Sequence, residues 1–369
     1  MIAHSLVDRL QFFLIGHALG IETSCDDTAV GIVTSSRVIL SDCIHLQSHL
    51  HEPKGGIVPT LAMVSHRKSL PTVIRDAVEK ARVDVLRDVD IIAVTRGPGL
   101  GPCLGVGVDA AKSLACVLRK PIIGVHHMEA HALTPRLLNP LLSFPYLTLL
   151  ISGGHTLILL TRRVNTHTIL STTIDDSIGE AFDKVTRLLN LPWLPGRSGG
   201  PGATLERYAS LGDASKYNFP IPMTKDKSQL QNSNMSFSGL KTAVKYLIEE
   251  EKLDVEDEEV RRDLAAAFQY AAVEHLIGKL RLCIKECCKG ELDVRKLVCS
   301  GGVARNGFIR ERLNKLAMEY DLELFFPPPE LCTDNGVMIA WAGIERYQCG
   351  LIDDYFFEQI PKWPIDSLG

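Results

Sequence analysis

The sequence predicts an α/β fold made of two duplicated lobes, each built on a mixed β-sheet. Strand-like and helix-like stretches alternate along the chain, which is the pattern of α/β proteins. Each half opens with two apolar runs around a tight polar turn, at residues 19–36 and 145–163. The length of 369 residues suits two domains. Lobes that begin with a hairpin and continue into βα crossovers predict a ribonuclease-H-like architecture, with ligand in the cleft between the lobes.

After the opening hairpin, the first half is predicted to contain three further strands and two helices. The strands are expected at 37–44, 89–101 and 121–127, and the helices at 66–83 and 106–120. Pro71 is expected in the first turn of helix 66–83, because a helix tolerates proline best there.

The second half repeats this scheme. A strand is expected near 167–174, and a helix with an acidic first turn follows within 174–191, as the helix dipole favours. Residues 191–240 are rich in Pro, Gly, Ser and Asn and are predicted to be loop, whereas 294–320 is predicted as strand, glycine turn and helix. The predicted domains are an N-terminal extension at 1–18, a first lobe at 19–145 plus 335–369, and a second lobe at 146–334.

The charge balance excludes a protein that binds nucleic acid through bulk positive charge. Forty basic and forty-four acidic residues give a net charge of -4, although a local basic groove stays open. No run reaches the roughly 18 apolar residues of a transmembrane helix, so no membrane span is predicted. The first eighteen residues contain one Arg and a cluster of bulky apolar side chains. That composition is typical of an unstructured tail or of a short organellar presequence.

Ten cysteines are spread along the chain without a CxxC pair. Several lie in apolar stretches, where free cysteine behaves as a small hydrophobic residue, so we predict a reducing compartment without disulfides. Cys283, Cys287 and Cys288 have a helical spacing that a metal could use, but no matching pair lies elsewhere. A buried helix face is the favoured interpretation.

The motif HHMEAH at 126–131 is the strongest candidate for chemistry. Residues i and i+4 of a helix share one face, so His127 and His131 can reach one metal ion, with a third ligand from elsewhere. Two histidines satisfied by backbone groups at a helix N-terminus would give the same pattern. A zinc peptidase is disfavoured, because Glu129 lies two residues from each histidine, not next to one as in HExxH, and should point away from a metal.

Three glycine turns follow apolar strands, at 96–101, 151–156 and 299–306. Such turns let a phosphate or ribose approach the backbone, but none is a P-loop or a dinucleotide fingerprint. The two SGG turns are expected at equivalent places in the two halves, which favours a nucleotide in the cleft.

Charged residues gather in a few places. The carboxylate clusters are Glu22, Asp26 and Asp27 in the first hairpin turn, then Asp175, Asp176, Glu180 and Asp183, and finally Asp334 before the last helix. An Asp at such a position is usually a helix N-cap. Basic residues at 305–315 are typical of a solvated helix face, with a nucleic-acid groove as the alternative.

These motifs occur together and in order in one known family. They are GIETSCDDT (20–28), GGIVP (55–59), RGPGL (96–100), VHHMEAH (125–131), LLISGGHT (149–156), IDDSIGEAFDKV (174–185), SFSGLKT (236–242), SGGVARN (300–306) and CTDNGVMIAWAG (332–343). From about residue 19 onward the chain resembles the tRNA threonylcarbamoyladenosine transferase family, formerly called O-sialoglycoprotein endopeptidase. The resemblance implies the actin/Hsp70/sugar-kinase-like (ASKHA) fold, with its interlobe active site.

The resemblance also implies an acyltransferase that moves the threonylcarbamoyl group from threonylcarbamoyl-AMP to N6 of adenosine 37 in tRNAs reading ANN codons. It implies one divalent metal ion per subunit, zinc or iron, bound by His127, His131 and Asp334. The residues implied to hold the adenylate are Leu150, Ile151, Ser152, Gly153, Gly154, Asp183, Gly200, Glu206 and Asn306. Because the adenine amine is a weak nucleophile, a carboxylate is expected to take its proton, Asp26 first and Asp27 second.

The same resemblance implies partners and a location. The segment GGPGATLE (199–206) is one residue longer than its counterpart in relatives, with Glu206 as the expected equivalent of their acidic residue. The N-terminal extension on a bacterial-like chain implies a mitochondrial member, with the cytoplasm as the alternative. Such a member would act on tRNA as a homodimer, away from membranes, with threonylcarbamoyl-AMP supplied by a separate synthase. A sugar-kinase-like ATPase and a regulatory protein without the metal ligands are the alternatives.

Overall fold

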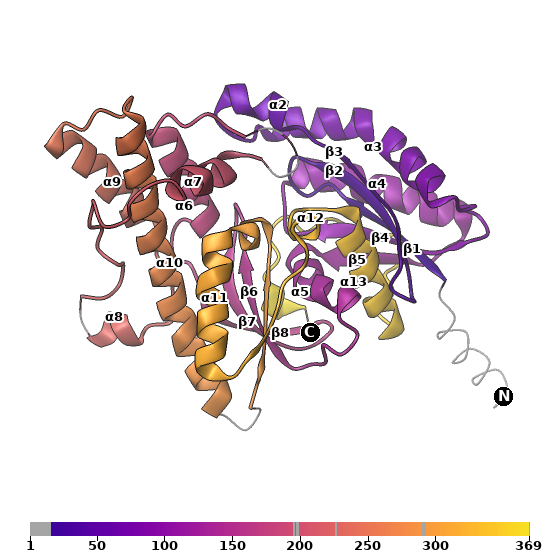
Figure 1. Ribbon diagram of the computed structural model, residues 1–369. Coiled ribbons are helices and arrows are strands. Elements are labelled where there is room, and N and C mark those ends of the chain that lie inside the picture. The colour runs from indigo at the N-terminus through magenta and orange to yellow at the C-terminus, as the bar shows by residue number, and fades with distance from the viewer. Residues whose placement is uncertain (1–15, 195, 197–198, 226, 290–292, 369) are drawn as a thin grey trace. The chain divides into compact units, whose positions relative to one another are not determined.

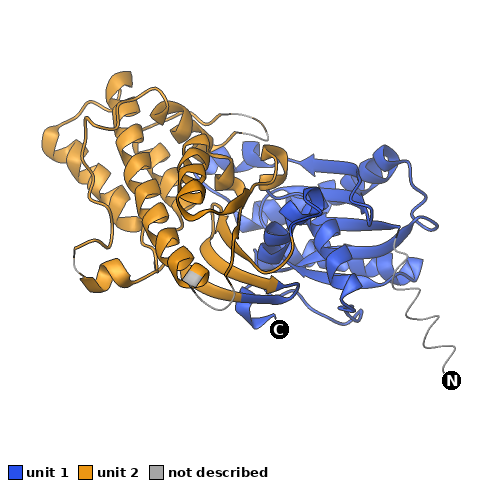
Figure 2. Cartoon of the chain, turned by 60° about the horizontal axis from the view of Figure 1, so that its bottom comes forward, with its two compact units in different colours: residues 1–142, 163–167, 333–369 blue, residues 143–162, 168–332 orange. Residues whose placement is uncertain are grey.

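The computed structural model describes residues 16–194, 196, 199–225, 227–289 and 293–368, so the predicted extension at 1–18 falls almost entirely outside them. The chain forms two compact units (Figure 2). Unit 1 contains residues 1–142, 163–167 and 333–369, and unit 2 contains residues 143–162 and 168–332. These bounds differ from the predicted lobes, because Asp334 and the stretch 163–167 belong to unit 1.

Unit 1 is built on a five-stranded sheet in the order β3-β2-β1-β4-β5. Its strands are β1 His17–Glu22, β2 Thr28–Thr34, β3 Ile39–His45, β4 Val89–Gly97 and β5 Ile122–His126. β1, β2 and β3 pair antiparallel, and β1, β4 and β5 pair parallel. Its helical segments are α2 Ser48–His51, η1 Glu52–Lys54, α3 Pro59–Ala81, α4 Gly101–Leu118, α5 His127–Leu138, α13 Gly336–Gln348 and η3 Ile365–Ser367.

Unit 2 repeats that sheet, in the order β10-β9-β6-β7-β8. Its strands are β6 Tyr146–Ile151, β7 Thr156–Arg163, β8 Thr166–Thr172, β9 Lys296–Ser300 and β10 Glu323–Phe325. Its helical segments are α6 Ile178–Leu188, α7 Pro201–Ala209, α8 Lys227–Gln231, α9 Ser238–Glu251, α10 Glu258–Lys289, η2 Gly302–Arg305, α11 Gly307–Tyr320 and α12 Pro329–Cys332. In both units the fourth strand pairs parallel to the first, so the predicted duplication is confirmed. The predicted location of ligand between the lobes stays a prediction.

The sheet of unit 1 has helices packed on both faces (Figure 1). Side chains alternate along a strand, and Leu19 and Ile21 of β1 belong to the apolar core that α3 and α4 share. Gly20, between them, therefore faces the other side, where α13 packs against β1, β2 and α5.

The backbone of α13 touches the backbone of the sheet without side chains between them. A Cβ atom on Gly20 would lie 2.3 Å from the carbonyl oxygen of Gly336, and a Cβ atom on Gly336 would lie 2.1 Å from the nitrogen of Gly31. Only glycine fits such close approaches. The glycines therefore set where α13 begins, and with it the position of Asp334.

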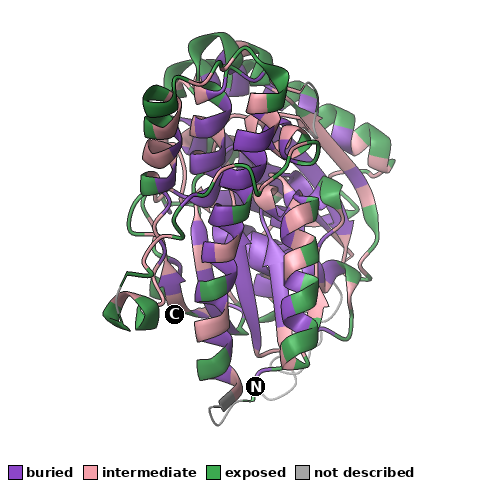
Figure 3. Ribbon diagram, turned by 60° about the vertical axis from the view of Figure 1, so that its left-hand side comes forward, coloured by how far each residue is buried: buried purple, intermediate pink, exposed green. Residues whose placement is uncertain are grey.

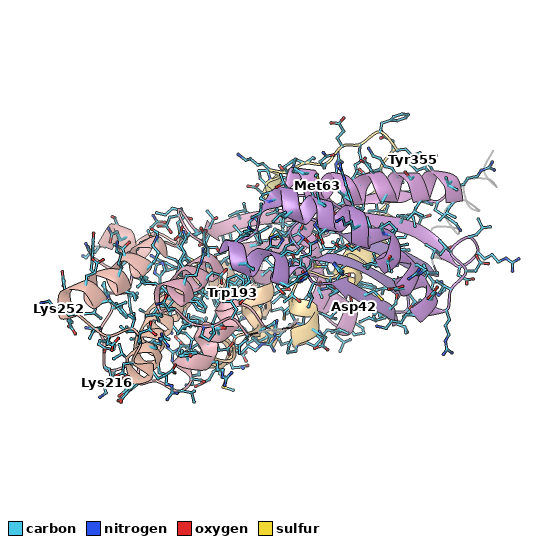
Figure 4. The ribbon with its side chains drawn as sticks, turned by 90° about the horizontal axis from the view of Figure 1, so that it is seen from above. Asp42, Met63, Trp193, Lys216, Lys252 and Tyr355 are labelled. Carbon is cyan, nitrogen blue, oxygen red and sulfur yellow. The ribbon has the colours of Figure 1, made fainter. Side chains whose placement is uncertain are left out.

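The core of unit 2 forms around α10, whose inward residues are buried along with the central strands (Figure 3). The strand β6 is buried at every position, as in sheets covered on both faces. Cys283 and Cys287 lie in this core, so the prediction of a buried helix face is confirmed. The outer surface of unit 2 carries exposed side chains such as Lys216 and Lys252 (Figure 4).

Two helices differ from the predictions. α3 begins at Pro59, so Pro71 lies in its middle and its predicted place in the first turn is wrong. Pro59 occupies the first helical position, where its missing N–H is tolerated, and buried Ala62 and His66 hold the first turns in the fold. Within the predicted loop 191–240, Pro201 starts the short helix α7.

One helix among the described residues, α4, is long and apolar enough to cross a membrane by length and composition alone. A single such helix is weak evidence, because core helices of soluble proteins pass the same test. In unit 1, α4 packs against β4 and α3.

We expect Gly20→Ala to destabilise the protein by at least about 2 kcal/mol, because the added methyl would overlap the backbone of α13. The melting temperature of the variant measures this loss. Gly278→Ala on α10 is the matched control: it has open space and removes a helix glycine, so it should stabilise by up to about 1 kcal/mol. Equal melting temperatures for Gly20→Ala and wild type would show that the backbones of β1 and α13 are not in close contact.

Candidate functional site

The two histidines of the predicted metal motif project from the first turns of α5. His126 caps this helix: its Nδ1 accepts a hydrogen bond from the Met128 N–H (3.1 Å), and its Nε2 donates to the Trp363 carbonyl (2.9 Å). Burial lowers the pKa of His126 to about 3, so this ring stays neutral and structural. The rings of His127 and His131, one helical turn apart, have centroids 4.9 Å apart.

Asp334 joins these histidines from a distant part of the sequence. Its Oδ1 lies 3.1 Å from His131 Nε2 and 3.4 Å from His127 Nε2. The side chain of Asn335, not of Asp334, caps α13 by accepting from the Met338 N–H (2.8 Å), so the carboxylate of Asp334 is left to face the histidines. The ligand atoms of the three residues lie within 4.8 Å of one another, all in unit 1.

Glu22, at the end of β1, belongs to the first predicted carboxylate cluster, but the sequence assigns it no role at this site. Its carboxylate is 1% exposed and lies 3.0 Å from His127 Nδ1. It also accepts hydrogen bonds from the Ser24 N–H and the Thr95 hydroxyl, each at 2.5 Å. A carboxylate that accepts from one ring nitrogen leaves the other free to bind a metal ion. The only signal in the sequence was an acidic residue closing an apolar strand.

The electrostatics of the cluster favour a cation. Burial opposes a charge on His127, yet the carboxylates of Asp334 and Glu22 outweigh it and raise the pKa of His127 well above its usual range. Burial also disfavours the charged form of Asp334, but the facing histidines lower the pKa of that carboxylate. Two carboxylates around two imidazoles therefore hold positive charge at this point.

The donor set fits a divalent metal ion. Two imidazole nitrogens and one carboxylate oxygen are ligands that zinc and ferrous iron accept, with positions left over for substrate oxygens. The hydrogen bond to Glu22 keeps Nε2 of His127 directed at Asp334, where the two residues can share one metal ion. The predicted ligands His127, His131 and Asp334 thus lie close together, and their arrangement suits the binding of one divalent metal ion.

The two predicted bases differ in their surroundings. Oδ1 of Asp27 accepts a hydrogen bond from the Gln47 N–H (3.0 Å), which ties the turn after β1 to the start of α2. Burial and the negative charge of Asp334 raise the pKa of Asp26. A carboxyl group with a raised pKa is the better proton acceptor near neutral pH.

Glu129 is not part of the metal cluster. It accepts hydrogen bonds from the Asn165 N–H (2.6 Å), His167 Nε2 (3.2 Å) and Arg346 Nη1 (2.7 Å). Burial alone would raise the pKa of Glu129, but these partners lower it to about 2. The predicted orientation away from the metal is confirmed, and it removes the base that a zinc peptidase would need.

In unit 2 the predicted adenylate residues begin at the turn after β6. Leu150 and Ile151 are buried strand residues, so they can offer a ligand only backbone groups. Gly153 and Gly154 are exposed, and nothing lies within 4 Å of their Cβ positions. Ser152 Oγ accepts from the His155 N–H (3.1 Å) and holds the turn in shape.

The two SGG turns lie side by side within unit 2, because β6 and β9 pair in parallel. A Cβ atom on Gly301, whose φ is +98°, would lie 2.4 Å from the carbonyl oxygen of Ile151. The prediction that they occupy equivalent places in the two halves is therefore wrong. By strand order, the counterpart of the turn after β6 is the turn after β1, which contains Asp26.

Asp183 and Gly200 meet at the start of α7. The carboxylate of Asp183 accepts a hydrogen bond from the Gly202 N–H, and Gly200, with φ +99°, precedes the helix. Burial raises the pKa of Asp183 to about 7 against the opposing charge of Arg187. This carboxyl group can therefore change charge near neutral pH.

Glu206 and Asn306 meet at the start of α11. Oε1 of Glu206 accepts from the Gly307 N–H (2.6 Å), and Oδ1 of Asn306 accepts from the Ile309 N–H (3.0 Å). Nδ2 of Asn306 also donates to Gln269 (2.8 Å). Since both side chains bond to the helix N-terminus, Glu206 has a structural partner at the position where a ribose contact was expected.

The basic residues of α11 pair within unit 2. Arg312 pairs with Glu274, and Lys315 pairs with Glu311 at 2.6 Å. The guanidinium of Arg310 lies 4.4 Å from the ring centre of Phe326. These contacts favour the interpretation of the basic residues as a helix face over the alternative of a nucleic-acid groove.

Comparison with known proteins gives relatives over most of the chain. Residues 38–341 match the family described as tRNA N6-adenosine threonylcarbamoyltransferase. The probable mitochondrial tRNA N6-adenosine threonylcarbamoyltransferase of Arabidopsis thaliana is 44% identical over 365 residues, covering 94% of this chain and 74% of that protein. The enzyme of that name from Zymomonas mobilis subsp. mobilis is 42% identical over 348 residues, covering 94% and 91%.

A similar fold occurs in a solved structure. Full-length HypF in its phosphate- and nucleotide-bound form has a TM-score of 0.58 at 14% identity, covering 90% of this chain and 46% of that chain. At this identity the likeness concerns the fold alone.

We expect Glu22→Gln to weaken the binding of Zn²⁺ by about 10- to 100-fold, because an amide holds the His127 ring less strongly than a carboxylate does. Competition with a chromophoric chelator measures the affinity. Glu129→Gln is the control: it removes an equally buried carboxylate of α5 that bonds elsewhere, so Zn²⁺ affinity should persist. Unchanged affinity in a folded Glu22→Gln variant would contradict the role of Glu22.

We expect Asp183→Asn to raise the melting temperature at about pH 8.5 by a few degrees. The pKa of Asp183 is about 7 when folded and about 3.9 when unfolded, so its contribution to stability is complete below about pH 4 and is lost as the pH rises through 7. The difference between variant and wild type should shrink toward pH 4.

Asp175→Asn is the control of opposite sign. Burial alone would raise the pKa of Asp175, but hydrogen bonds from Ser236, Phe237 and Ser238 lower it, so its stabilisation is present above about pH 4. This variant should melt lower than wild type at pH 8.5. If both variants shift in the same direction, the assigned surroundings of Asp183 are wrong.

Proposed function

The chain belongs to the tRNA N6-adenosine threonylcarbamoyltransferase family, and we propose that it transfers the threonylcarbamoyl group of threonylcarbamoyl-AMP to N6 of adenosine 37 in tRNAs reading ANN codons. The observation that carries this proposal is the cluster of His127, His131 and Asp334. It lies inside the region matched to the family, and a sugar-kinase-like ATPase of the same fold would have no use for it.

One divalent metal ion per subunit, zinc or iron, is proposed for this cluster. When bound, the ion polarises the carbamoyl carbonyl or holds the threonyl oxygens of the donor. Glu22 fixes the orientation of the His127 ring, and the start of α13 fixes Asp334. The protein residues thus supply a preformed set of ligands.

The adenylate part of the donor is assigned to unit 2. Backbone groups of the turn Ser152–Gly154 can face the phosphate, because the two glycines leave the main chain exposed. Asp183 can accept hydrogen bonds from ribose hydroxyls in its charged form, with Gly200 beside it. Asn306 and Glu206 belong to the same proposed site, and Leu150 and Ile151 position the turn.

The proposed transfer is one substitution at the carbamoyl carbon. The N6 amine of adenine attacks this carbon, the bond from the carbon to the phosphate oxygen of AMP breaks, and AMP leaves with the bonding electrons. Asp26 takes the proton that N6 loses, and Asp27 is the second candidate. Main-chain N–H groups of the glycine turn stabilise the departing phosphate.

The partners and location complete the proposal. The substrates are tRNA and threonylcarbamoyl-AMP made by a separate synthase, and the active form is a homodimer. A mitochondrial location is supported by the name of the Arabidopsis thaliana relative, with the cytoplasm as the alternative.

We expect the double variant His127→Ala/His131→Ala to lose at least about 100-fold in transfer rate, because both imidazole ligands are removed. The measurement is threonylcarbamoyladenosine in a nucleoside digest of tRNA incubated with threonylcarbamoyl-AMP. Replacing the exposed pair Lys245 and Glu249 by alanine is the control double variant.

Full activity in the folded histidine variant would refute the metal-assisted reaction. The function itself is tested by digesting tRNA from cells that lack this protein. Unchanged threonylcarbamoyladenosine in every compartment would refute it.

A further inference from the structure

His51 is a buried histidine of unit 1 with one ring nitrogen unused. It is the last residue of α2 and is 2% exposed. Its Nδ1 accepts a hydrogen bond from the Val58 N–H (3.3 Å), so in the neutral ring the proton is on Nε2. This Nε2 is buried and has no hydrogen-bond partner within the described part of the chain. A buried donor without an acceptor is unfavourable for stability, so a ligand that supplies an acceptor at this point would gain a hydrogen bond.

The contacts of α2 bring His51 to the turn that carries Asp26. Gln47, which precedes the helix, donates its backbone N–H to Asp27, and it lies four residues before His51, one helical turn away. His66 holds the same turn from another side, with Nε2 3.0 Å from the Cys25 carbonyl oxygen. Burial and Asp334 raise the pKa of Asp26, and the nearby His51 acts in the opposite direction. The Nε2 donor of His51 and the carboxylate of Asp26 therefore lie in the same part of unit 1, joined through Gln47 and the turn after β1.

This pair matches a pattern that adenine presents. The exocyclic amine of adenine is a donor, and a ring nitrogen beside it, N7 on one edge and N1 on the other, is an acceptor. Guanine has an oxygen acceptor in place of the amine and would put it against the acceptor Asp26. A donor beside a carboxylate can therefore favour a base that has an amine next to a ring acceptor, as adenine has, over guanine.

We propose that His51 and Asp26 together recognise the target adenine, with His51 Nε2–H donating to the ring nitrogen beside the amine and Asp26 accepting from the amine. The inference rests on the proposed function, in which Asp26 takes the proton of N6. His51 is then a specificity-determining residue, and Asp26 both reads and deprotonates the amine.

Two glycines lie in the turn next to His51. Gly55, with φ +70°, and Gly56 lie between His51 and Val58, and nothing lies within 4 Å of either Cβ position. For a base to reach Nε2 this turn must shift, and we infer that its two glycines permit the movement.

Two substitutions separate base recognition from a structural role. His51→Gln puts an amide donor near the position of Nε2 but gives up the acceptor for Val58, whereas His51→Asn keeps an acceptor near Nδ1 and removes the donor. We expect His51→Asn to lose about 10- to 100-fold in kcat/KM for tRNA, with Zn²⁺ affinity unchanged. His51→Gln should stay within a few-fold of wild type. The reverse order of the two variants would overturn the proposal in favour of a structural role.

Modified substrates test the contact itself. Synthetic tRNA is prepared with 7-deazaadenosine or with 1-deazaadenosine at the target position, which removes one ring acceptor at a time. One of these should slow the wild-type enzyme by about the factor lost in His51→Asn, and should slow His51→Asn no further. If the deaza-substituted tRNAs slow the His51→Asn variant as much as they slow the wild-type enzyme, His51 does not contact the ring nitrogen and the proposal is wrong. A wild-type protein that modifies no tRNA at all would instead refute the proposed function, so the two failures are distinguishable.

Discussion

The site depends on the contact between the backbone of α13 and the backbone of the first two strands. Gly20 lies two residues before Glu22 on β1, and Gly336 lies two residues after Asp334. A contact between these glycines therefore sets the spacing between Asp334, a proposed metal ligand, and Glu22, the carboxylate that orients His127. Because no side chain lies between the two backbones, no rotamer change can loosen the arrangement. The cluster of ligands is in this way built into the core of unit 1.

The two units share one strand order, but the turns that follow their first strands differ in chemical character. The turn after β1 carries acidic side chains, which together with the histidines of α5 create a site for a cation. The turn after β6 is Ser-Gly-Gly, which removes side chains and exposes main-chain groups suited to an anion. Duplication supplied the same β-strand scaffold twice, and the residues that follow the first strand decide what each copy can bind.

The sequence predicts features that depend on neighbouring residues, but it does not predict contacts between residues that are far apart in the chain. The spacing of His127 and His131 follows from the helical period, and the alternating pattern was enough to predict both sheets. The chain order does not reveal which strands are neighbours, so the SGG turns of β6 and β9 were assigned to different halves. Glu22 acts on a histidine 105 positions away, and no periodicity marks it. Asp334 was found through the family resemblance, because its own surroundings resemble an ordinary helix cap.

A net charge of -4 constrains how such a protein can select its substrate. Bulk attraction to phosphates carries no information about base identity, and on this chain Arg312 and Lys315 of α11 are already paired with carboxylates. A few directed contacts with the base can supply that information. Directed contacts are strongest where water is excluded, because a buried donor that lacks its acceptor is penalised. The Nε2–H of His51, a side chain only 2% exposed, is a donor of the kind that such selection can use.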